Sequence, residues 1–242
     1  MKIVSFSQCS LFYGPWQALK EVSFDVEEGE IFGLVGSDGA GKSSLLRMAA
    51  TMLMPSSGKI FIDGLDVAKE RKKVKALIGY MPQRFALYQD LTVEENFSFF
   101  LDVFGIKGAE RKQKMERYLG FSRLLPFLDR RAGDLSGGMK QKLGLACTLV
   151  HEPRLLILDE PTCGVDPVSR QEFWEMLMDM RKEGKTILIA TSYLDEGERC
   201  ERLGVMHGGE LLAVCSPKEL VKGSDTLEEA LVKLLEVHLS YE

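Results

Sequence analysis

Short runs rich in β-branched and aromatic residues alternate with polar turns in the first third of the chain. They predict strands over Lys2 to Ser7, Val22 to Val26, Glu30 to Val35 and Lys59 to Ile62. Between the last two runs, the spacing of leucine and methionine predicts a helix over Gly41 to Thr51. The chain therefore begins as sheet, with one helix interposed.

The middle of the chain has a helical period. From Thr92 to about Leu128 the sequence predicts helix, and Thr92 followed by Glu95 is typical of a capping box, which begins a helix. Apolar residues recur in this segment at helical spacing, namely Phe97, Phe100, Leu101 and Phe104.

Strand and helix patterns alternate again in the last third. Strands are predicted over Leu155 to Leu158 and Thr186 to Ala190, and helices over Pro167 to Lys182 and Leu194 to Cys200. Such alternation favours an α/β fold with a largely parallel sheet covered by helices. We find no internal repeat or low-complexity linker, so we expect one compact unit with two lobes.

The tail from Thr226 to Leu239 predicts an amphipathic helix. Its leucines stand at positions 227, 231, 234 and 235. We expect this face to pack against the core, and a contact with a partner is the alternative interpretation.

Composition narrows the class of protein. The chain has 242 residues, of which 45% are hydrophobic, and a formal net charge of −5, which argues against nucleic acid as a partner. The basic residues from Arg71 to Lys75 are interpreted as a solvated helix face. No apolar stretch approaches the about 20 residues of a membrane span, so any membrane role would depend on a partner. The cysteines form no C-x-x-C pair and suggest reduced thiols in a cytosolic protein: Cys9, Cys147, Cys163, Cys200 and Cys215.

A glycine-rich segment after the predicted strand ending at Val35 matches the pattern G-x-x-x-x-G-K-[ST]. Its glycines let backbone amides turn toward phosphate oxygens, and the following helix adds its positive end. Lys42 supplies a cation for the β- and γ-phosphates, and the Ser43 hydroxyl can ligate Mg²⁺. The role of the carboxylate of Asp38 is not set by the pattern. The nucleotide-binding residues predicted here are Gly36, Ser37, Asp38, Gly39, Ala40, Gly41, Lys42, Ser43 and Ser44.

Two carboxylates follow a strand of the buried type. Asp159 and Glu160 come directly after the run from Leu155 to Leu158. Because side chains alternate along a strand, we expect the two acids to serve different roles. We assign Asp159 to Mg²⁺ and Glu160 to the water that attacks the phosphate.

A third motif selects one family among the many that carry a phosphate-binding loop. The segment Leu135-Ser136-Gly137-Gly138-Met139-Lys140-Gln141-Lys142 resembles the signature motif of ABC ATPases. An N-cap role explains Ser136, but it does not explain the pair Gly137 and Gly138, which is costly within a helix.

The resemblance extends over almost the whole chain. It implies a P-loop NTPase of the ABC type, with a mixed core sheet, an N-terminal antiparallel β subdomain and a helical signature subdomain. Residues 1–242 would form a single ATP-binding domain, with a helical signature lobe at about 88–150 and a helical tail at about 217–242.

Further site residues are implied by the same resemblance. Tyr13 matches the aromatic residue that stacks on adenine, with a core tyrosine as the alternative. Gln83 matches the glutamine that senses magnesium and water. The segment from Arg84 to Asn96 resembles the surface on which a membrane domain docks. Asp166 lies in the sequence Gly164 to Pro167, which matches the D-loop and would reach across a dimer interface.

In this family two ATPase domains meet head to tail, and each ATP lies between the phosphate loop of one and the signature serine of the other. The implied cofactors are ATP and Mg²⁺. The implied partners are a second ABC ATPase domain and an integral membrane transporter subunit. The expected location is cytoplasmic, peripheral on the inner face of the cell membrane.

One position departs from the family pattern. Ser192 stands where the family usually has a histidine that contacts the γ-phosphate, and serine cannot carry positive charge. The three histidines lie elsewhere in the pattern, at positions 151, 207 and 238. We therefore expect slow hydrolysis at this chain's own loop and favour pairing with a second domain that carries the histidine. The alternative is a homodimer in which the serine suffices.

The chain looks like the first ATPase domain of bacterial tandem ABC-2 type exporters, above all from Leu135 to Glu196. It is expected to power an exporter through a separate membrane subunit. The alternatives are a small importer ATPase and a nucleotide switch without transport. The sequence lacks the charged linker or long coiled coil that ABC proteins of translation and DNA repair carry.

Overall fold

Two sheets frame the protein in the computed structural model, which describes residues 1–84 and 87–239. The strands are β1 (Lys2–Tyr13), β2 (Trp16–Glu27), β3 (Ile31–Gly36), β4 (Ser57–Ile62), β5 (Leu65–Asp66), β6 (Ile78–Met81), β7 (Leu155–Asp159), β8 (Thr186–Thr191), β9 (Arg202–His207) and β10 (Glu210–Cys215). One sheet has the order β2-β1-β4-β5, and the other has the order β10-β9-β3-β8-β7-β6. The first is antiparallel, whereas the second is parallel except for β10. This is the mixed core sheet with an antiparallel β subdomain that the sequence predicted.

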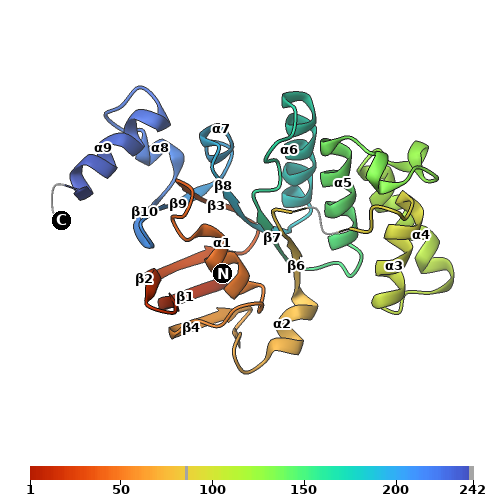
Figure 1. Ribbon diagram of the computed structural model, residues 1–242, viewed down its shortest axis with the longest axis horizontal. Helices are drawn as coiled ribbons and strands as arrows, with labels where there is room; N and C mark the ends of the chain where they lie inside the picture. Colours follow the sequence, from red (N-terminus) through yellow and green to blue (C-terminus); the bar gives the residue numbers. More distant parts are fainter. Residues whose placement is uncertain (85–86, 240–242) are drawn as a thin grey trace.

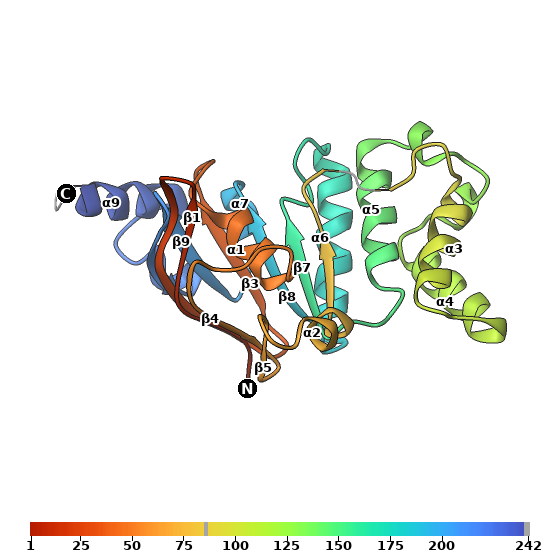
Figure 2. The same ribbon diagram turned by 60° about the horizontal axis from the view of Figure 1, so that its bottom comes forward.

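The helices cover the larger sheet and extend beyond it. They are α1 (Lys42–Ala49), α2 (Arg71–Leu77), α3 (Val93–Val103), α4 (Gly108–Phe121), α5 (Gly137–Thr148), α6 (Pro167–Lys182), α7 (Leu194–Gly197), α8 (Pro217–Leu220) and α9 (Leu227–Leu239). Helices α3, α4 and α5 stand together at one end of the molecule, and α9 lies at the opposite end (Figures 1 and 2). Within the described residues, no helix combines the length and apolar character needed to cross a membrane.

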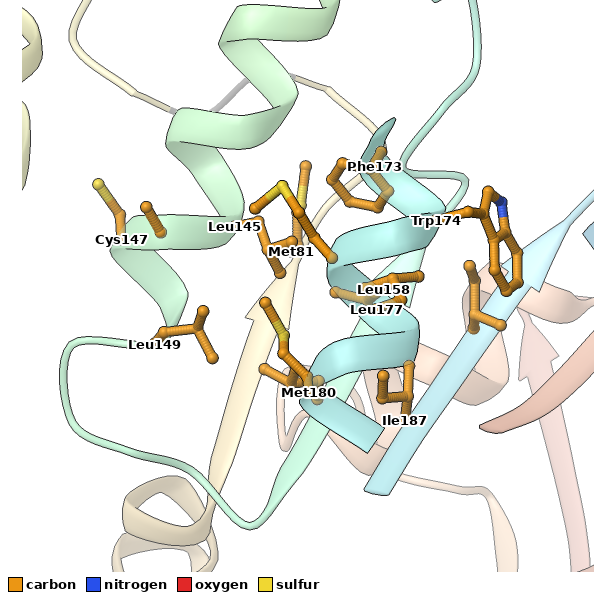
Figure 3. Packing of buried hydrophobic residues seen from close by; sticks show 14 of the residues in the cluster. Met81, Leu145, Cys147, Leu149, Leu158, Phe173, Trp174, Leu177, Met180 and Ile187 are labelled. Atoms are coloured by element: carbon orange, nitrogen blue, oxygen red, sulfur yellow. The ribbon is translucent and has the colours of Figure 1, made fainter. Parts of the chain in front are cut away.

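The larger sheet is buried on both faces. Along β7, Leu156 and Leu158 belong to one hydrophobic cluster, whereas Leu155 and Ile157 belong to the other. This arrangement is typical of central parallel strands. Figure 3 shows the first cluster, in which α5 and α6 bring side chains such as Trp174 against the sheet. The second cluster fills the space between the two sheets and α1.

Several boundaries differ from those predicted. Strand β1 continues past Ser7 to Tyr13, because a bulge at Gln8, with φ of 48°, resets the alternation of side chains. The stretch from Thr92 to about Leu128, predicted to be helical, forms two separate helices, α3 and α4, and Gly105 between them has φ of 70°. The predicted capping box at Thr92 and Glu95 is confirmed.

Other elements lay outside the sequence prediction. Strands β6, β9 and β10 were not foreseen, although β6 and β9 pair in parallel within the larger sheet. The basic segment beginning at Arg71 forms α2 and is exposed apart from Val74 and Leu77, as expected for a solvated helix face. In the tail, Leu227 and Leu231 are buried in the core and Leu234 packs against it, so core packing is confirmed.

Candidate nucleotide-binding site

The candidate site forms where four parallel strands end. The phosphate loop follows β3, Gln83 follows β6, Glu160 follows β7 and Ser192 follows β8. Since the carboxyl ends of parallel strands meet at one edge of a sheet, residues distant in sequence come together there. Open α/β sheets bind ligands at this edge.

The phosphate loop contains positions where the backbone conformation or a close neighbour favours glycine. Gly41 precedes α1 with φ of 102°, and a Cβ on it would lie 2.5 Å from Cδ2 of Leu19. A Cβ on Gly36 would lie 2.1 Å from the carbonyl oxygen of Met206. Helix α1 begins without a side-chain cap, so its first backbone amides can bind an anion.

Lys42 is buried, with 4% of its surface exposed, and its ammonium group lies among oxygens. Its Nζ donates to the carbonyl oxygens of Gly36 at 2.6 Å and Ser37 at 3.1 Å. It also donates to Oγ of Ser192 at 3.2 Å and lies 3.5 Å from the Glu160 carboxylate. The ammonium group of Lys42 therefore already lies at the loop where a phosphate would bind.

Asp159 and Glu160 contact different hydroxyl groups of the site. The Ser43 hydroxyl donates to Oδ1 of Asp159 at 2.7 Å, whereas the Ser192 hydroxyl donates to Oε1 of Glu160 at 2.7 Å. Glu160 has φ of 48°, a left-handed conformation that is costly for a residue other than glycine. Such strain is found most often at functional sites.

The residues present fit a magnesium ion. Oδ2 of Asp159 is buried and has no hydrogen-bond partner, and it belongs to the carboxylate that the Ser43 hydroxyl contacts. Burial raises the pKa of this carboxyl, against the hydrogen bond from Ser43, and a bound cation would favour its charged form. Hydroxyl and carboxylate oxygens are ligands that Mg²⁺ accepts, with phosphate and water completing its shell. No group of three or more His, Cys, Asp or Glu side chains suited to a metal occurs in residues 1–84 and 87–239.

A cavity of about 410 Å³ opens beside the loop. Tyr13 stands on its rim, exposed, with its hydroxyl 3.3 Å from Oγ of Ser44, so it is not a core tyrosine. Trp16, which pairs with Tyr13 across the β1–β2 turn, is 73% exposed and lines the same cavity. Sequence reasoning missed Trp16, although a second aromatic residue three positions from Tyr13 was a usable signal. The lining residues are Tyr13, Trp16, Ala18, Asp38, Gly39, Ala40, Gly41, Lys42, Ser43, Ser44, Gln83 and Glu160.

The predicted signature residues lie outside this cavity. Ser136 caps α5 by accepting from the backbone amide of Met139, as predicted, and Leu135 is buried. A Cβ on Gly138 would lie 2.3 Å from Cβ of Ser169, so this glycine also has a packing reason that the sequence did not show.

The predicted D-loop adjoins the signature turn. Asp166 caps α6 and accepts from the amide of Ser169 at 2.9 Å, and the hydrogen bonds from Ser169 lower the pKa of its carboxyl. The backbone carbonyl of Gly164 would lie 3.8 Å from a Cβ on Gly137. Two of the predicted docking residues, 85 and 86, lie outside the described residues.

A buried carboxylate accepts hydrogen bonds from residues at or just after the ends of β7 and β8. Glu196, on α7, is 1% exposed and accepts hydrogen bonds from the hydroxyls of Thr162 and Thr191. Arg170, on α6, also donates to it at 3.2 Å. Thr162 and Thr191 stand close in sequence to Glu160 and Ser192. Glu196 therefore fixes the segments that carry these two residues.

The strand, loop and helix around Lys42, with two acids at the end of β7 on the far side of β8, define a P-loop nucleotide-binding protein. The profile of the family described as ABC transporter matches residues 19–163. The chain belongs to the ABC transporter family.

Two relatives and one solved structure illustrate the likeness. The chain is 50% identical over 205 residues to the probable multidrug ABC transporter ATP-binding protein YbhF of Escherichia coli, covering 85% of this chain and 36% of that protein. It is 39% identical to the Nod factor export ATP-binding protein I of Rhizobium etli, covering 91% and 70%. A dimeric structure of the ATP-binding cassette MJ0796 in a post-hydrolysis state, bound to ADP and Pi, is 26% identical with a TM-score of 0.80, covering 88% of this chain and 98% of that one. The chain thus spans about a third of the length of YbhF.

Proposed function

We propose that this chain binds ATP with Mg²⁺ and hydrolyses it to ADP and phosphate. Lys42, Ser43 and Glu160 line one cavity, and the Ser43 hydroxyl contacts Asp159; this arrangement supports the proposal most strongly. Lys42 and the loop amides would hold the phosphates, while Tyr13 would stack on adenine. The magnesium ion would neutralise phosphate charge, held by Ser43 and Gln83, with Asp159 binding directly or through water. Glu160 would orient the attacking water and accept its proton.

We further propose that the hydrolysis powers an exporter through a separate membrane subunit, with the chain placed at the cytoplasmic face of the membrane. The names of the relatives support a transport role, since one is called a probable multidrug ABC transporter ATP-binding protein and the other a Nod factor export ATP-binding protein. The segment from Arg84 to Asn96 would be the docking surface. The test is affinity purification of the chain from membranes of its own source. An integral membrane protein with several spanning helices should copurify, and its absence would contradict the transport role.

Residues 1–242 would form one ATP-binding domain, with the helical lobe at about 88–150 and the tail at about 217–242. A second ATPase domain is the partner that the site favours. The signature residues Ser136 to Gly138 lie outside the cavity of their own chain, so in this proposal they complete a site on another domain. The dimeric structure of the related cassette supports this arrangement.

Ser192→His is expected to raise steady-state ATP hydrolysis by the purified chain about tenfold or more. Serine hydrogen-bonds but carries no charge, whereas histidine can support the charge that develops on the transferring phosphate. Turnover is measured across a series of protein concentrations, because the working form is a dimer. Steady hydrolysis by the wild type, with little change in the variant, would favour an ordinary homodimer over pairing with a histidine-bearing domain.

A further inference from the structure

Asp38 lies beside Ser192, 154 residues away in sequence. Its Oδ1 atom is 3.3 Å from Oγ of Ser192, which is itself 2.7 Å from Oε1 of Glu160. A hydroxyl has one hydrogen to donate, and the shorter contact assigns it to Glu160. The Asp38 carboxylate therefore lies beside this hydroxyl but does not receive its hydrogen.

The same hydroxyl connects Asp38 to the cation of the loop. Nζ of Lys42 lies 3.2 Å from Oγ of Ser192, so a single hydroxyl oxygen separates the Asp38 carboxylate from the ammonium group. Lysine at this position of a phosphate loop binds the β- and γ-phosphates. The far end of a nucleoside triphosphate must then approach Asp38, whereas a diphosphate ends one phosphate short of it.

We propose that Asp38 is a specificity-determining residue that weakens the binding of ATP relative to ADP at this chain's own site. The proposal rests on the proposed nucleotide binding and adds its selectivity. Each γ-phosphate oxygen that Lys42 attracts brings negative charge toward the Asp38 carboxylate. Two unit charges about 4 Å apart repel enough, even fully screened by water, to change an equilibrium about fivefold. ADP lacks the group that meets this repulsion.

The test compares two ligands on the purified full chain by isothermal titration calorimetry. The ligands are ADP and a non-hydrolysable ATP analogue, both with Mg²⁺. Asp38→Asn keeps the side-chain shape and removes the charge. It should strengthen binding of the triphosphate analogue about fivefold or more and change ADP affinity less than about twofold.

Two control variants distinguish the effect of the charge at position 38 from the effect of the net charge of the protein. Asp38→Glu keeps the charge and should keep the wild-type preference for ADP over the analogue. Asp129→Asn removes one negative charge from an exposed position in the helical lobe and should leave both affinities unchanged. Equal changes for the two nucleotides in Asp38→Asn, or no change, would overturn the role of Asp38 while leaving nucleotide binding intact. A wild-type chain that binds neither nucleotide would instead overturn the proposed function.

Discussion

Glu160→Gln is expected to lower ATP hydrolysis about 10²–10⁴-fold while leaving nucleotide binding nearly unchanged. Glutamine has the same shape but cannot accept the proton of the attacking water. The carboxylate is buried and already held by the Ser192 hydroxyl at 2.7 Å, so the amide should occupy the same position. Turnover is measured by phosphate release under saturating ATP and Mg²⁺.

This measurement is made in two backgrounds, the wild type and Ser192→His, because the wild-type rate is expected to be low. Glu198→Gln is the matched control, since Glu198 is exposed on the surface close to α7. Undiminished turnover in Glu160→Gln in both backgrounds would show that another group activates the water.

Glu196→Ala is expected to lower the free energy of unfolding by about 3–5 kcal/mol. The carboxylate is almost completely buried, and its removal leaves the hydroxyls of Thr162 and Thr191 without their acceptor and Arg170 without a buried partner. The loss is measured by urea titration with linear extrapolation. Glu198→Ala, two residues along, should change stability by no more than about 0.5 kcal/mol.

A loss below about 1 kcal/mol in Glu196→Ala would mean that water or Asp195 replaces the carboxylate. Asp195 is exposed and already accepts from Arg170 at 2.9 Å, so it is the nearest alternative partner. Because Glu196 holds the segments beside Glu160 and Ser192, the variant should also hydrolyse ATP more slowly under conditions where it remains folded.

The sequence was enough to predict that the phosphate loop lies close to Asp159 and Glu160. Each follows a run of apolar residues that reads as a buried strand, and parallel strands end at a common edge. Ser192 also follows such a run, but its place in the site was implied by the resemblance to the ABC family. The runs are local sequence patterns, and one rule of sheet topology predicts that the residues after them lie close together.

Other features depend on tertiary packing that no local pattern shows. Glu196 looks like an ordinary surface acid, because nothing in its neighbours indicates that two threonine hydroxyls and Arg170 surround it. The contact between Asp38 and Ser192 joins two loops and depends on side-chain rotamers. The bulge at Gln8 breaks the alternation on which strand prediction depends, so β1 ended too early in the prediction.

The close packing of Gly138 on Ser169 has a mechanical consequence. There is no room for even a methyl group between the first turns of α5 and α6, so these turns cannot slide past each other without separating. A displacement of α5 that keeps this contact carries Asp166 along with Ser136. The two groups would then arrive at a partner domain simultaneously, and a distance label on either should report the same displacement.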